Sequence, residues 1–410
     1  MSSISASRVY MPTYNQRLVL ELVRVRGPIS RADIVRLSGL TFPSVSRIVG
    51  ELIERNLIAE KRQRRGGMGK PPTELELNPE SAFSIGLNVD RDHLSAVIVD
   101  LAGVVKGHYH HPLEDPSPKS VLPLLSEAAE TLLNEHGVAK SLLLGAGVGL
   151  PAPLHTSAVD GLSHNSALPE DLSGWQSVAL PTTLGQQLGC PVLLENNATA
   201  AAIGERWYGV GRNIDNFFFV FFGYGVGGGL ILEGRPHVGF RGFAGEFGNI
   251  PIRAPKRGMP KHTGEYAAMG LLHERLKEAG VATDAETLAA RYAEGDAIIL
   301  EWLDTAAQHL APALVYAEYL IDPEAIIFGG RLPAPLTDGL IERVAALLPA
   351  LRHPAKPYEP RLLRGETGEN AAALGAATIP IYRALTPDPV PEGRYYSRAH
   401  PATVQPMRAF

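Results

Sequence analysis

The sequence predicts an α/β protein in which a small, basic helical head precedes a larger body of strands that alternate with helices. The charge divides in the same way, because residues 1–75 carry 13 Lys and Arg against 6 Asp and Glu, whereas the remainder carries 25 against 37. From Phe83 onward, apolar runs typical of strands alternate with helical stretches, which is the pattern of an α/β fold. A basic head on an acidic body favours a nucleic-acid-binding module joined to a second function.

Length and composition limit the organisation further. A chain of 410 residues is long enough for two or three domains. We expect a head over residues 1–78, a body over 79–385 and a loosely ordered, proline-rich tail over 386–410. The single cysteine, Cys190, excludes an internal disulfide framework and a zinc site built from several thiolates. The sequence has no apolar run near the roughly 18 residues that a membrane span needs and no apolar signal-peptide core, so we expect a reducing, cytoplasmic location.

Two short helices are expected at the start of the head. The second begins at Ser30, which forms a variant of the capping box with Asp33, and it should bury Ile34 and Leu37. The first is expected over residues 16–25 with four apolar side chains on one face: Leu18, Val19, Leu22 and Val23.

A third helix follows after a tight turn that contains glycine. Thr41 is its expected cap, and Pro43 is tolerated in the first turn. Two short helices joined in this way match a helix-turn-helix. The apolar face of the third helix has the spacing i, i+3, i+4 and i+7: Val45, Ile48, Val49 and Leu52.

The polar face of this third helix and the basic stretch after it predict binding to double-stranded DNA. Small polar residues and one arginine suit a helix that enters the major groove by its N-terminal end. The stretch EKRQRRGGMGKPPTELELNP would form a wing, and its Gly-Lys-Pro is similar to tripeptides that insert a cation into a narrow minor groove. The alternative is a three-helix protein-interaction module with a solvated basic loop. The candidate DNA-binding residues are Thr41, Ser44, Ser46, Arg47, Arg62, Arg64, Arg65 and Lys70.

The body is expected to contain two halves with a cleft between them, because strands open in a similar way near Ser84 and near Phe217. A glycine turn follows the second opening, although such a turn alone would indicate no more than a β-hairpin. The expected elements are three strands over 83–111, a helix over 120–136, a strand over 141–151, a strand and Ala-rich helix over 190–209, two strands over 216–234, helices over 265–320, a strand over 324–333 and a helix over 368–382.

Motifs in a shared order give the chain a resemblance to transcriptional regulators of the ROK family, in which a winged helix precedes a sugar-kinase-like domain. The resemblance covers roughly residues 15–385 and implies an actin-like (ribonuclease H-like) two-lobed sugar-kinase fold with a sugar in the cleft. The family contains both ATP-dependent sugar kinases and sugar-responsive repressors. The motifs are SRADIVRLSGLTFPSVSRIVGELIERNLI, the GKP of the wing, GAGVGLPAP, LENNATAAAIGE, FGYGVGGGLILEG, FAGEFGN, IIFGG and LGAA.

The resemblance also shows where this chain departs from the kinases. A kinase of the family has a D-x-G-x-T turn and a catalytic base after an Asn. Here Asn88 replaces the metal-binding Asp, Asp90 replaces the glycine, and Asn197 stands at the position of the base. A neutral amide cannot accept the proton, and loss of a general base costs about 10²–10⁴-fold in rate. We therefore expect a kinase scaffold that is not an enzyme.

The zinc motif of the family is absent as well. The family's Gly-His pair is replaced by Gly248 and Asn249, and the segment that would carry three cysteines has none. His262 alone cannot form a tetrahedral site, and the histidines at 108, 110 and 111 are expected to be solvated. We expect no metal and no cofactor.

The resemblance also implies a partial sugar site. Amide and carboxylate groups suit sugar hydroxyls, which both donate and accept. The alternative is structural, with Asn196 and Asn197 capping a helix and Glu246 pairing with an arginine such as Arg241. The residues that match the family's sugar ligands are Asn165, Asn196, Asn197, Glu246, Asn249 and Glu265.

Together these patterns predict a homo-oligomeric DNA-binding regulator, a repressor of carbohydrate-related genes whose inactive kinase-like body senses a sugar or related small molecule. A dimer would match a pseudo-palindromic operator. Two alternatives stay open at this point: an ATP-dependent sugar kinase fused to a DNA-binding head, and a regulator whose body senses a protein partner.

Overall fold

The structure is a computed structural model that describes residues 12–62, 73–151, 172, 174–175, 178–240, 242–253, 261–356 and 358–386. Several predicted residues fall outside this range, so their predictions stay untested. These are the wing residues Arg64, Arg65 and Lys70, the candidate ligand Asn165, the alternative partner Arg241, the tail from 387 onward, and the side chain of Arg62.

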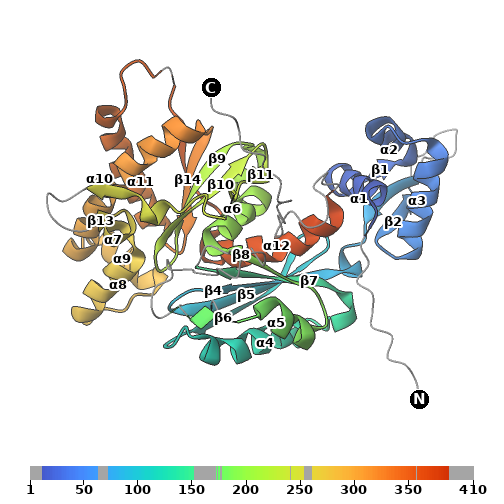
Figure 1. Ribbon diagram of the computed structural model, residues 1–410, viewed down its shortest axis with the longest axis horizontal. Helices are drawn as coiled ribbons and strands as arrows, with labels where there is room; N and C mark the ends of the chain where they lie inside the picture. Colours follow the sequence, from blue (N-terminus) through green and yellow to red (C-terminus); the bar gives the residue numbers. More distant parts are fainter. Residues whose placement is uncertain are drawn as a thin grey trace, which may run out of the picture.

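The head contains three helices and a three-stranded antiparallel sheet in the order β1-β3-β2 (Figure 1). Each helix begins at a side-chain cap, with Thr13, Ser30 and Thr41 accepting the N–H of the third residue beyond the cap. The hairpin of β2 and β3 is the base of the predicted wing. The bounds are α1 (Tyr14–Arg26), β1 (Ile29–Ser30), α2 (Arg31–Ser38), α3 (Phe42–Glu54), β2 (Ile58–Arg62) and β3 (Thr73–Leu77).

The predicted apolar face of the third helix is confirmed, since all four of its side chains are buried. Two other predictions about the head are wrong in part. Helix α1 buries Val19 and Val23 together with Leu20, while Leu18 and Leu22 are only half-buried, because α1 packs against both α3 and β3. Leu37 is 45% exposed, since the short helix α2 packs on the head core through Ile34, with Val35 partly buried beside it.

The two lobes of the body contain sheets of the same topology, which confirms the predicted duplication. The strand orders are β6-β5-β4-β7-β8 and β11-β10-β9-β14-β15. In each sheet the first three strands in sequence are antiparallel neighbours, and the next two add in parallel on the other side. The bounds are β4 (Phe83–Val89), β5 (His93–Asp100), β6 (Val105–Pro112), β7 (Leu143–Leu150), β8 (Val192–Asn196), β9 (Phe217–Phe222), β10 (Val226–Leu232), β11 (Arg235–Pro236), β14 (Ala325–Gly330) and β15 (Arg361–Arg364).

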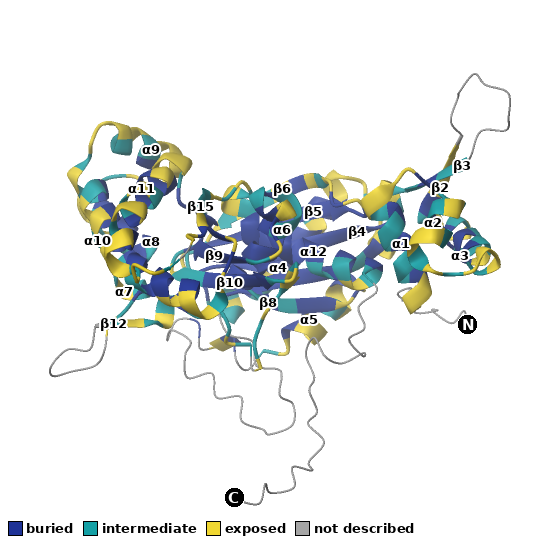
Figure 2. Ribbon diagram, turned by 90° about the horizontal axis from the view of Figure 1, so that it is seen from above, coloured by how far each residue is buried: buried dark blue, intermediate teal, exposed yellow. Residues whose placement is uncertain are grey.

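Helices cover both faces of these sheets, so the strands and the helices packed between the two sheets are largely buried (Figure 2). Strand β9 shows why, because its residues are all apolar and alternate between the faces: Phe217, Phe219 and Phe221 pack with α6, whereas Phe218, Val220 and Phe222 pack with α10 and α11. No helix among the described residues is long and apolar enough to span a bilayer. The main helices are α4 (Pro118–Glu135), α5 (Leu180–Leu188), α6 (Asn197–Tyr208), α7 (Gly264–Ala267), α8 (Met269–Glu278), α9 (Ala285–Ala293), α10 (Ala297–Ile321), α11 (Ala334–Leu351) and α12 (Ala371–Leu385).

Helices α6 and α12 lie against each other between the two sheets and are almost wholly buried. Their approach depends on glycine, since a Cβ on Gly375 would lie 1.6 Å from the carbonyl oxygen of Ala200. Helix α12 also packs on α1, where Leu374, Ala377 and Ile381 join the apolar core of the head. The head and the body therefore share one continuous core.

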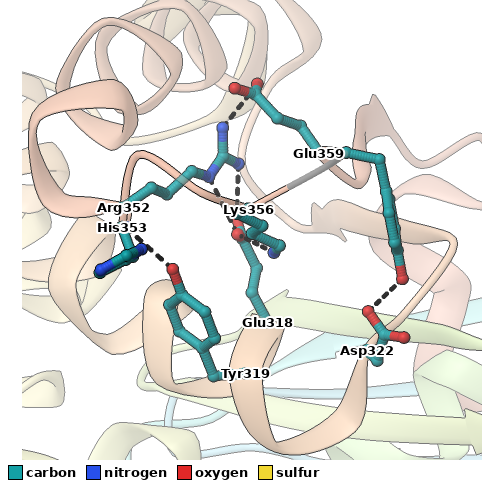
Figure 3. Close-up of polar contacts among 8 residues, drawn as sticks. Glu318, Tyr319, Asp322, Arg352, His353, Lys356 and Glu359 are labelled. Atoms are coloured by element: carbon teal, nitrogen blue, oxygen red, sulfur yellow. Dashed lines mark hydrogen bonds and ion pairs between the residues drawn. The ribbon is translucent and has the colours of Figure 1, made fainter.

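A buried ion cluster joins the ends of α10 and α11 in the second lobe (Figure 3). The carboxylate of Glu318 is fully buried and accepts hydrogen bonds from Arg352 at 2.6 and 2.9 Å and from Lys356 at 2.6 Å. The second arm of Arg352 pairs with Glu359 at 2.6 Å. Because a buried carboxylate is costly without such partners, this cluster fixes the segment after α11 against α10.

Candidate ligand-binding cleft

A cavity of about 390 Å³ lies between the lobes and is lined by residues from both. The first lobe contributes the turn after β4 and the start of α6, and the second contributes the glycine turn between β9 and β10, the segment 245–249 and the region of α7 and α8. The polar side chains on its walls are Asp90, Arg91, Asn196, Asn197, Tyr224, Glu246, Asn249, Glu265 and Glu274.

The start of α6 forms one wall. Asn196 is the N-cap of this helix, and its Oδ1 accepts the N–H groups of Ala198 at 2.9 Å and Thr199 at 3.2 Å. The alternative that Asn196 caps this helix is therefore confirmed for its Oδ1. Asn197 is the first helical residue, 7% exposed, and lines the cavity. The positive end of the helix dipole thus faces the cleft, which favours an electron-rich oxygen of a ligand there.

Glu246 and Asn249 form the opposite wall. The Nδ2 of Asn249 donates to the Oε2 of Glu246 at 2.8 Å, and burial raises the pKa of Glu246 above its ordinary value. Glu265 lines the same cavity, but its carboxylate is held by the backbone N–H of His262 at 2.8 Å, with the ring Nδ1 at 3.2 Å. That hydrogen bond lowers the pKa of Glu265. This wall thus presents carboxylate and amide groups, which suit the hydroxyls of a polyol.

Asp90 makes a contact that the sequence did not indicate. It is 2% exposed, and its Oδ2 accepts the backbone N–H of Tyr224, in the glycine turn of the other lobe, at 2.9 Å. Its Oδ1 accepts the N–H of Arg91 at 2.8 Å, and the guanidinium of Arg91 lies 5.4 Å from the centre of the Tyr224 ring. A carboxylate of the first lobe therefore contacts the backbone of the glycine turn in the second. No local pattern in the sequence predicts this contact, because Asp90 and Tyr224 are 134 positions apart.

A second interlobe contact lies two residues further on. Asp92 accepts two hydrogen bonds from Nη1 of Arg331, at 2.7 and 2.9 Å, and one contact from His93 at 2.8 Å. Burial opposes ionisation of Asp92, but the hydrogen bond of His93 and the charge of Arg331 outweigh it and hold its pKa well below the ordinary range. Asp90, Asp92 and His93 could offer metal-ligand atoms within 4.8 Å of one another, but the carboxylate of Asp92 is already paired with the guanidinium of Arg331.

The two positions at which a kinase needs carboxylates hold amides. Asn88 is 1% exposed, and its Oδ1 has no hydrogen-bond partner among the described residues. Asn197 lies at the cleft but cannot act as a general base. The arrangement can bind hydroxyl groups, and the described side chains offer no proton acceptor at the position of the base.

In the segment expected to lack zinc, His262 pairs with Glu265, and the ring of Tyr266 stacks on His309 at 3.6 Å. Of the histidines expected to be solvated, those at 108 and 110 are exposed and that at 111 is half-buried. The absence of a metal stays a prediction.

In the head, the structure places four of the predicted DNA-binding residues in or beside the first half of α3. Thr41 caps the helix and contacts the hydroxyl of Ser44 at 2.8 Å, and Ser46 is half-buried. Arg47 has a 66% exposed side chain and pairs with Glu51 one turn later. The end of α3 that would enter a groove is thus accessible, with one arginine on it.

Comparisons with known proteins agree with this architecture. The model of the ROK family matches residues 84–382. The xylose repressor of Bacillus spizizenii is 27% identical over 391 residues, which is 92% of this chain and 97% of the repressor. Two solved structures at 21% identity share the fold. The first is a ROK family transcriptional regulator described as a homologue of the Escherichia coli Mlc protein, with a TM-score of 0.72 over 91% of this chain and 97% of that one. The second is a ROK family glucokinase from Streptomyces griseus in complex with glucose and AMPPNP, with a TM-score of 0.61 over 73% of this chain and 99% of that one. The predicted actin-like fold behind a winged head is confirmed, and the chain belongs to the ROK family.

Proposed function

We propose that this chain is a DNA-binding transcriptional repressor of carbohydrate-related genes, whose body binds a sugar or related polyol without phosphorylating it. The observation that carries the proposal is a polar cleft that keeps Asn196 and Glu246, while amides, Asn88 and Asn197, stand at the positions of the kinase carboxylates. The xylose repressor, which is similar over nearly its whole length, supports the same function.

The head, over residues 1–78, is the DNA-binding part of the proposal. Its charge is positive, its second and third helices have the helix-turn-helix arrangement, and Arg47 lies exposed on the third. The body, over residues 79–385, is the sensor. We propose a homodimer or higher homo-oligomer, because two heads related by a two-fold axis bind two half-sites of a pseudo-palindromic operator.

The repressor proposal is tested with an operator selected from random duplexes by the purified protein. A panel of sugars is then screened for a shift in melting temperature and for a change in operator affinity. At least one sugar should raise the melting temperature and change the operator affinity, with a coupling free energy between sugar and DNA binding of about 1–3 kcal/mol. Glu246→Ala should abolish the response and leave DNA binding without sugar intact. Failure to select any duplex, or a panel without any response, would reject the proposal.

A sugar kinase fused to a DNA-binding head is the second candidate, favoured by the shared fold with the glucokinase and by the retained glycine turn. An assay of ADP release with the same sugars separates the two, since the proposal expects no turnover. A third candidate is a body that senses a protein partner. A pulldown that captures one specific protein, together with no sugar-dependent melting shift, would favour that candidate.

A further inference from the structure

The glycine turn between β9 and β10 donates a backbone N–H to a carboxylate of the other lobe. Such turns bind anions because their backbone N–H groups converge on one point. Here the N–H of Tyr224 is donated to Oδ2 of Asp90 at 2.9 Å. A Cβ at Gly223 would lie 2.4 Å from that same oxygen, so the carboxylate approaches the turn where only glycine permits it.

The position of Asp90 is built into the fold. The residue follows β4 directly, and its own N–H donates to the carbonyl of His93, which closes the turn between β4 and β5. Its Oδ1 accepts the N–H of Arg91, and the residue is 2% exposed. Each carboxylate oxygen therefore has a backbone donor, as a buried charge requires. The neighbouring pair of Asp92 and Arg331 holds the same turn against the second lobe.

The charged side chains on the walls of the cleft also disfavour an anionic ligand. The described lining residues carry four carboxylates and one guanidinium: Asp90, Glu246, Glu265, Glu274 and Arg91. The guanidinium lies 5.4 Å from the centre of the Tyr224 ring. A dianionic phosphate would therefore lose its water and meet an excess of like charge in a partly closed cavity.

We infer that Asp90 excludes phosphate, and that the effector of the cleft is an uncharged polyhydroxyl compound rather than a sugar phosphate or a nucleotide. A neutral ligand meets no such repulsion, and its hydroxyls match the amide and carboxylate groups of the walls. The inference rests on the proposed function for the sugar itself, but the exclusion of phosphate can be tested without it.

The test uses full-length protein, with inorganic phosphate as the first probe in isothermal titration. Wild type should bind phosphate no more than weakly. Asp90→Gly removes the carboxylate and frees the N–H of Tyr224, so it should bind phosphate at least about tenfold more tightly. Asp90→Asn removes the charge with little change in shape and should gain part of that affinity. Asp215→Asn, whose side chain is 67% exposed and lies outside the cleft, is the charge-matched control and should gain nothing.

The second arm compares glucose, xylose and N-acetylglucosamine with their phosphorylated counterparts on wild type. An uncharged member should bind, and its phosphate should bind at least about tenfold more weakly. The inference is overturned if wild type binds a sugar phosphate or ATP as tightly as the neutral sugar. It is also overturned if both Asp90 variants, folded by circular dichroism, gain no phosphate affinity. If no neutral sugar binds while Asp90→Gly gains phosphate, phosphate exclusion stands, and the sugar-sensor proposal fails separately.

Discussion

The guanidinium carbon of Arg24 lies 4.5 Å from the ring centre of Trp207. Arg24 belongs to α1 of the head, and Trp207 lies in the last turn of α6, whose first residue, Asn197, lines the cleft. Trp207 also contacts Tyr382 of α12 edge-on at 6.3 Å between ring centres. One helix of 12 residues therefore connects the ligand cavity at its N-terminus to the DNA-binding head at its C-terminus.

Arg24→Ala should uncouple the two functions. Closure of the lobes on a ligand would move α6, and the cation–π contact is worth about 0.5–2 kcal/mol, a large part of an ordinary coupling energy. We expect the sugar-induced change in operator affinity to fall about threefold or more, while sugar affinity is unchanged. The measurement is an operator titration with and without saturating sugar. Arg26→Ala, an exposed arginine in the same turn of α1, is the matched control and should keep the full response.

Arg47→Ala should weaken operator binding by about 1–3 kcal/mol and relax sequence specificity at one base pair, since an arginine can bond two acceptors of guanine. Arg47 pairs with Glu51 on the surface of α3 and is 66% exposed, so its removal should leave the melting temperature nearly unchanged. Binding to a set of single-base operator variants is the measurement. Arg36, which is equally exposed and paired on α2, serves as the control. An Arg47→Ala protein with the wild-type specificity profile would contradict the assignment.

The ion cluster of Figure 3 predicts a strong asymmetry between two glutamates that bind the same arginine. Glu318 is fully buried, so Glu318→Ala removes the carboxylate that pairs with the nearly buried Lys356 and leaves Arg352 with the exposed Glu359. It should lower the free energy of unfolding by about 3 kcal/mol. Glu359 is 63% exposed, and Glu359→Ala should cost less than about 1 kcal/mol. Urea denaturation of the two variants measures the difference. Equal losses of unfolding free energy in the two variants would show that burial does not determine how much each ion pair stabilises the protein.

The sequence could predict features that depend on residues close together in the chain. The apolar face of α3 and the caps Ser30 and Thr41 are local patterns, and the structure confirms them. The duplicated sheets were predicted from two similar strand openings, which are also local. Leu37 was misplaced because its burial depends on what packs over α2, which spacing within the helix does not contain.

The contacts that define the cleft are long-range, and this explains why they were missed. Asp92 and Arg331 are 239 positions apart and meet only because the ends of β4 and β14 face each other across the lobes. Asp90 was noted as a replacement of the family's glycine, but its bond to Tyr224 requires the relative placement of two sheets. The candidate sugar ligands came from the resemblance, since nothing in the spacing of Asn196 and Glu246 indicates that they line one cavity.

His273 predicts how stability depends on pH. It lies on α8, is 5% exposed, and its Nε2 has no hydrogen-bond partner among the described residues. Burial lowers the pKa of His273 from 6.5 to about 4, with the positive charge of Arg331 as the next cause and a smaller opposing effect of Asp92. The folded protein thus holds this ring neutral at a pH where the unfolded chain binds a proton.

The sign of the effect follows from this difference in protonation. Between the unfolded and folded pKa values the unfolded state binds more protons, so stability is full above about pH 6.5 and is lost as the pH falls towards 4. This one group should cost about 2 kcal/mol in unfolding free energy between pH 7 and pH 5. His273→Gln should flatten the profile in that window, whereas His108→Gln, at an exposed histidine, should leave it unchanged. The window lies above the range in which Asp92 titrates, so an unaltered slope in the His273→Gln protein would show that its ring is protonated in the fold.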